Sequence, residues 1–143
     1  MRFPFALPLL AASSFALLLA ACSSTPTTAP AGSKQQFQQA LTPEISLNYQ
    51  IERKASNVNG KACYAFITGT VHNRSAETLS RQSVLDFIVI HNGKQLFRDL
   101  SNPISDIPPG SHVAFSMVDS PVHRDGCPSY DRIDVNLRKV VVR

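Results

Sequence analysis

The stretch that decides the fold is EISLNYQIE, residues 44–52. Its apolar side chains occupy every second position, at Ile45, Leu47, Tyr49 and Ile51, and polar side chains fill the positions between them. Successive side chains of a β-strand point to opposite faces, so this period of two predicts a strand with one buried face.

More strands are predicted on the C-terminal side. Segments 62–73 and 83–91 are apolar on both faces, which is typical of central strands, and Gly69 is expected at a bulge or a close approach. Asn92 and Gly93 separate two apolar runs, which is the strongest short-range signal of a hairpin. Two later segments, 111–118 and 130–143, alternate again. Their expected inward residues are Val113, Phe115, Met117, Ile133, Val135 and Leu137.

The N-terminus differs in composition from this region. Residues 1–21 have one basic residue, then an apolar run, then small residues, which is the layout of a secretory signal peptide. Leu19-Ala20-Ala21-Cys22 resembles the lipobox of bacterial lipoproteins, and this resemblance implies that Cys22 carries lipid and becomes the new N-terminus. The residue after it is Ser23, not Asp, and by resemblance to the sorting pattern of enteric bacteria this implies an outer-membrane location.

The segment after the leader is expected to be a tether. Residues 22–40 are rich in Ser, Thr, Pro, Ala and Gln, and such a composition cannot bury enough surface to offset the entropy lost on ordering. Within it, QFQQAL (36–41) allows one helical turn. The compact domain is therefore expected to span 41–143.

The other two cysteines are expected to form a disulfide. Cys63 and Cys127 are an even pair in a chain predicted to be exported to an oxidising compartment. Their wide separation disfavours a redox pair of the Cys-x-x-Cys type, and neither has histidine or cysteine neighbours at metal-ligand spacing.

About six or seven short strands, separated by turns and without a convincing helix, predict an all-β antiparallel sandwich with one disulfide. The segments ITGTVHNRSAETL, VLDFIVIHNGKQL and ISDIPPGSHVAF resemble the FxLYD type of immunoglobulin-like domain over residues 65–116. The resemblance implies an immunoglobulin-like sandwich and no catalytic residues. The matching positions are Gly69, Val71, Asn73, Ser75, Asn92, Gly93, Pro109, Gly110 and Phe115.

No catalytic or metal motif stands out in the sequence. His72, His91, His112 and His123 form no HxH or HxxxH pair, so a metal site would have to be gathered from separate strands. Asp86 and Asp134 interrupt apolar strands and are expected either to face outward or to protect a sheet edge as inward charges. A catalytic pair of carboxylates is the less favoured interpretation, because no local catalytic motif accompanies them. The charge of +4 is scattered, which disfavours a nucleic-acid partner. The chain is therefore expected not to be an enzyme and to need no cofactor.

The sequence features are compatible with two different functions. The first is a non-enzymatic protein-binding or envelope-assembly accessory, such as a pilotin-like protein or a scaffold, on the periplasmic face of the outer membrane. The second is a carrier of a small ligand or metal. The first uses a sheet edge or the loops after residues 101 and 120. The partner-binding residues expected in those loops are Asn102, Pro103, Ile104, Asp106, Arg124 and Arg132.

Overall fold

A computed structural model describes residues 32–56 and 62–142. The predicted signal peptide, Cys22 and the tether up to residue 31 lie outside the described residues. Among those described there is no helix long and apolar enough to cross a membrane.

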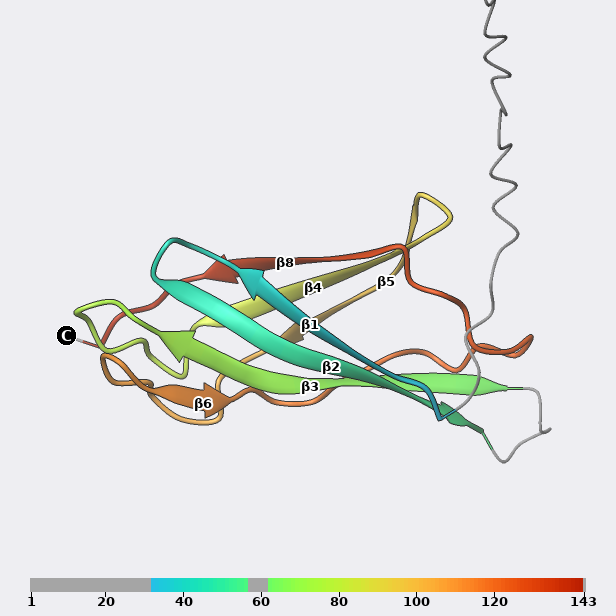
Figure 1. Cartoon of the computed structure of the whole chain (residues 1–143), viewed down its shortest axis with the longest axis horizontal. Helices are drawn as coiled ribbons and strands as arrows, with labels where there is room; N and C mark the ends of the chain where they lie inside the picture. The colour runs from blue at the N-terminus through green and yellow to red at the C-terminus, as the bar shows by residue number, and fades with distance from the viewer. Residues whose placement is uncertain (1–31, 57–61, 143) are drawn as a thin grey trace, which may run out of the picture.

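The described chain is built from eight strands, all of whose pairings are antiparallel (Figure 1). The first sheet has the order β1-β2-β3-β6, with β7 also pairing with β3, and the second has the order β5-β4-β8. The strands are β1 Lys34–Ala40, β2 Ile45–Ala55, β3 Cys63–Asn73, β4 Val84–His91, β5 Lys94–Ser101, β6 His112–Ala114, β7 Val118–Asp119 and β8 Arg132–Arg138.

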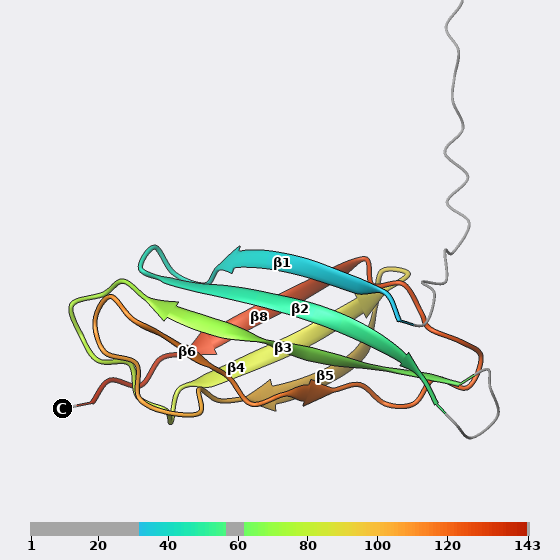
Figure 2. The same ribbon diagram turned by 60° about the horizontal axis from the view of Figure 1, so that its bottom comes forward.

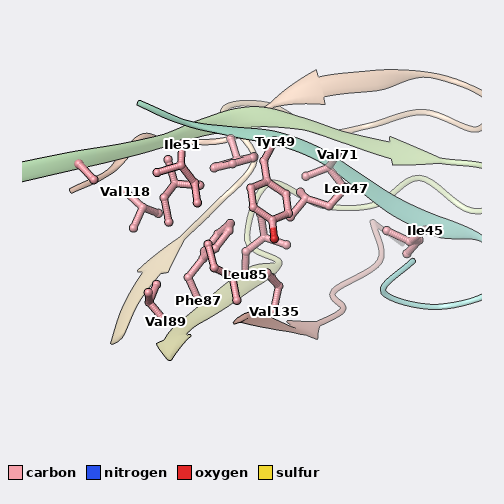
Figure 3. Close-up of a cluster of buried hydrophobic side chains, with 14 of the residues drawn as sticks. Ile45, Leu47, Tyr49, Ile51, Val71, Leu85, Phe87, Val89, Val118 and Val135 are labelled. Carbon is pink, nitrogen blue, oxygen red and sulfur yellow. The ribbon is translucent and has the colours of Figure 1, made fainter. Parts of the chain in front are cut away.

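The two sheets pack face to face as a sandwich (Figure 2), which confirms the predicted fold class. The alternating residues of 44–52 contribute one half of the core, because Ile45, Leu47 and Ile51 are buried toward the second sheet. Phe87 of β4 meets Tyr49 edge to face, with ring centroids 6.1 Å apart (Figure 3). Such interdigitation of two inner faces is what holds sandwiches together.

The hairpin and the central strands form as predicted. Asn92 and Gly93 both have positive φ, 50° and 69°, as a tight two-residue turn requires. Gly69 lies at a close approach, because a Cβ there would be 2.1 Å from the carbonyl oxygen of Asn48. The cysteine prediction is also confirmed, since Cys63 and Cys127 are disulfide-bonded with their Cα atoms 4.9 Å apart.

The predicted boundary between tether and domain is wrong. Residues 34–40 form β1, which pairs along its whole length with β2, and QFQQAL makes no helical turn. Phe37 stacks on Tyr49 with a centroid distance of 5.2 Å. Pairing to a long strand and one aromatic contact thus order a segment that has no buried face of its own.

The predicted inward position of Met117 is also wrong. Met117 is 53% exposed, and Val118 is fully buried instead. Between β6 and β7 the register against β3 shifts by one residue, which reverses the alternation. The shift occurs where the segment leaves β3 to bond the 102–104 loop, because the Ser116 amide donates to the Asn102 carbonyl at 2.8 Å.

Candidate binding surfaces

The two predicted partner loops lie at opposite ends of the sandwich. The 120–131 loop is held at the start of β3 by the disulfide and by two backbone hydrogen bonds between Cys63 and His123, of 2.8 and 2.7 Å. The 102–111 loop lies at the other end of β3, where the Asn73 amide donates to the Ser111 carbonyl at 2.9 Å. Eleven strand residues, about 33 Å, separate these ends, so the two loops do not form one surface.

Most of the predicted partner residues in the 102–111 loop contact other residues of the domain. Pro103 is buried and forms a bridge with Phe115, and Asn102 donates its side-chain amide to the Ser83 carbonyl at 2.7 Å. Asp106 accepts from the Arg81 amide at 2.7 Å. Ile104 is 62% exposed and is the residue of the four that remains available to a partner.

The strand carboxylates face outward, each beside an arginine. Asp86 accepts two hydrogen bonds of 2.7 Å from Arg98, and these bonds, with the arginine charge, hold the pKa of Asp86 below its usual value. Asp134 pairs with Arg132 at 3.0 Å, while Arg124 is exposed. A carboxylate neutralised in this way is a surface ion pair of small energetic value.

The fold stacks the rings of two of the four histidines. His72 on β3 and His112 on β6 are register partners whose rings stack with centroids 4.9 Å apart. His72 Nε2 lies 3.1 Å from both the Asn48 amide nitrogen and the Thr70 hydroxyl. Burial, then the charges of His112 and Arg74, lower the pKa of His72, which favours its neutral form. No group of three or more potential metal ligands occurs within residues 32–56 and 62–142.

The outer face of the five-stranded sheet is polar without being charged at its centre. A shallow depression of about 510 Å³ has its floor at Phe37, Tyr49 and Gly69, and the polar side chains around it are amides and one hydroxyl. They are Gln36, Gln38, Asn48, Gln50 and Thr68.

Five strands of the described chain pair on one side only: β1, β5, β8 and the short β6 and β7, which have three and two residues and pair with β3 alone. The long edges are therefore β1, β5 and β8. Exposed edges invite pairing with another chain, and proteins guard them with charges and bulges. Arg132, Asp134 and Arg138 guard β8. Arg98, Asp99 and the register shift after Val89 guard β5. Between Lys34 and Ala40, β1 has only glutamines and Phe37, so β1 is the unguarded edge.

A buried arginine holds β1 in place. Arg53 of β2 is 1% exposed, donates from Nη1 to Gln35 Oε1 at 2.9 Å, and lies 4.6 Å from the ring centre of Tyr130. Its burial lowers the pKa of the guanidinium. Lys34 adds an ion pair with Glu52 at 3.5 Å. The edge is therefore a fixed template for pairing.

The sequence pattern did not reveal this edge, because whether a strand is central or peripheral depends on pairing order. The available signal was QQFQQ itself, a charge-free segment next to a predicted strand.

Comparison of the chain with protein-family profiles, with curated proteins and with solved structures finds no match.

Proposed function

We propose that this chain is a lipid-anchored lipoprotein of the bacterial outer membrane whose sandwich is a non-enzymatic, protein-binding accessory. The observation that carries the proposal is the unguarded edge of β1. Its contact with a partner would be strand addition, in which an extended segment continues the sheet through backbone hydrogen bonds.

The position of β1 in the chain supports this role. The strand begins at Lys34, which lies 12 residues after the proposed lipid-bearing Cys22. A tether of that length reaches a few tens of ångströms at most when extended, so the edge would stay close to the membrane surface. An anchored partner, or one that crosses the membrane, would meet the edge at a raised effective concentration.

The test is position-specific photocrosslinking in bacterial envelopes that express the full chain. A photoreactive residue replaces Gln38 on β1, and the matched control replaces Leu100, which is 57% exposed on β5. We expect a protein adduct from position 38 that is at least about fivefold stronger than from position 100. Equal adducts from both positions, or none from position 38, would overturn the proposal.

A second candidate is a metal carrier, favoured by the stacked pair His72 and His112. Two imidazoles supply half of the four ligands that Zn²⁺ usually takes, and an exogenous ligand would supply the rest. Calorimetric titration with Zn²⁺ and with Cu²⁺ tests it. Binding that His112→Ala abolishes supports the carrier, and heats unchanged by that substitution exclude this pair as the site.

A further inference from the structure

We infer that the strand added to β1 comes from a second copy of this chain, so that the protein forms a two-fold dimer with one continuous sheet. The inference rests on the proposed role of the β1 edge and names its partner. The observation behind it is that β1, KQQFQQA, reads the same in both directions for two residues on each side of Phe37.

The backbone of β1 offers its free groups at matching positions. Two backbone hydrogen bonds set the pattern toward β2: the Arg53 amide donates to the Ser33 carbonyl at 3.1 Å, and the Leu41 amide donates to the Ile45 carbonyl at 2.9 Å. Antiparallel ladders alternate, so the odd-numbered residues of β1 bond β2. The even-numbered residues therefore direct their N–H and C=O groups away from the sheet.

A two-fold axis at Phe37 satisfies these free groups. Gln36 of one copy then faces Gln38 of the other, and Lys34 faces Ala40, which are all even-numbered positions. These pairs exchange backbone hydrogen bonds, and the two Phe37 residues form the non-hydrogen-bonded pair on the axis. An isologous interface requires this kind of self-complementarity, because the same patch must serve both subunits.

The side chains are compatible with this pairing as well. Within QQFQQ the facing pairs are amide with amide and ring with ring. Lys34 faces the uncharged Ala40, so no like charges oppose each other across the axis. Figure 2 shows β1 at the outside of its sheet with β2 on its inner side. Joining two five-stranded sheets there brings the amide-lined depressions of both copies side by side on one face.

Register-specific cysteine crosslinking of the full chain tests the pairing. Phe37→Cys places its thiols on residues about 4.5 Å apart at Cα, within disulfide range. Gln39→Cys, on the same strand and face, is the control, because its two copies would be about 13 Å apart. We expect a disulfide-linked dimer from Phe37→Cys at least about tenfold above the parent chain, which retains Cys22. We expect the parent level from Gln39→Cys.

Charged substitutions at positions 36 and 38 supply an independent measurement of the pairing. Gln36→Lys with Gln38→Lys sets ammonium groups against each other, and Gln36→Glu with Gln38→Glu does the same with carboxylates. Light scattering should find each variant chain at least about tenfold weaker in self-association than the parent, and an equimolar mixture should restore dimers. Circular dichroism verifies the fold of each.

The outcomes separate this inference from the proposed function. Phe37 crosslinks with charge-dependent dimerisation establish the dimer. A monomeric parent chain without Phe37 crosslinks overturns the inference, and an adduct of another protein at position 38 would then retain the proposed function. A dimer that forms equally in both charge variants also overturns the inference, because its interface lies elsewhere.

Discussion

At the scale of single residues, Asn73 shows how much one buried side chain organises. Its Nδ2 donates to the carbonyls of Glu77 and Ile107 at 2.7 and 2.9 Å, and its Oδ1 accepts from the amide and the hydroxyl of Ser75. Asn73 and Ser75 matched the resemblance noted in the sequence. Their role here is to close the turn after β3 and bind it to the loop before β6.

We predict that Asn73→Ala lowers the free energy of unfolding by about 2–4 kcal/mol, because it leaves several buried backbone groups without partners. Asn48→Ala is the control, since Asn48 is exposed, and we expect a change within about 0.5 kcal/mol. Urea denaturation measures both. Equal effects of the two substitutions would contradict this account of Asn73.

Tyr49 predicts a dependence of stability on alkaline pH. Burial, with a smaller effect of the Asp134 charge, raises its pKa from 10.0 to about 12. The folded state thus favours the neutral phenol, so this stabilisation is complete below pH 10 and is lost as pH rises from 10 to 12. The expected loss is about 2–3 kcal/mol. Denaturation at stepped pH should show a shallower decline for Tyr49→Phe, and identical slopes would refute the assignment.

At the scale of elements, the pairing of β2 with β3 depends on a glycine. A Cβ at Gly69 would lie 2.6 Å from the Cα of Tyr49, besides its clash with Asn48. We predict that Gly69→Ala destabilises the domain by about 1–3 kcal/mol, because the strands must separate to accept it. Thr68→Ala, whose side chain faces the other way, should change stability by less than about 0.5 kcal/mol. Thermal denaturation distinguishes the two.

Strands with a clear pattern were predictable, and β1 was not. Residues 45–51 alternate strictly, and Asn92-Gly93 marks a turn, so local sequence suffices for β2 and for the β4–β5 hairpin. The strand β1 has one large apolar side chain, Phe37, and it is ordered by its pairing with β2, a long-range contact that no local pattern reports. The wrong prediction that Met117 rather than Val118 is buried has the same origin, because contacts with the 102–104 loop set the register there.

The candidate site was harder to predict than the fold. Loop residues such as Asn102 and Asp106 have polar side chains, which suggested availability to a partner, but both are used in hydrogen bonds within the domain. The β1 edge became visible only once strand order placed β2 on one side of it. Pairing order is a long-range property, so composition alone does not report it.

At the scale of the whole molecule, the disulfide closes a loop across the domain, with a sequence separation of 64 residues. We predict that Cys63→Ala with Cys127→Ala lowers the free energy of unfolding by about 4 kcal/mol, the value expected for a loop of this length. Guanidinium denaturation of both proteins measures this. Thiol titration of the unreduced parent protein should find neither cysteine reactive, and two reactive thiols would contradict the bond.

The proposed anchor gives a second prediction at this scale. Cys22→Ser removes the thiol that would carry the lipid, so the protein should leave the membrane fraction and incorporate no labelled palmitate. Fractionation of the envelope with immunodetection is the measurement. Retention of Cys22→Ser in the outer membrane with the label still attached would disprove lipidation at this cysteine.

The position of β1 also has a mechanical consequence. Tension on the chain ahead of Lys34 loads the β1–β2 ladder at one end, so its seven residue pairs would open one after another, as in a zipper. Residues 63–127 cannot lengthen beyond their covalent link. Pulling would therefore release β1 before the disulfide-closed remainder, so the strand would serve as a reversible breaking point between the proposed membrane anchor and the domain.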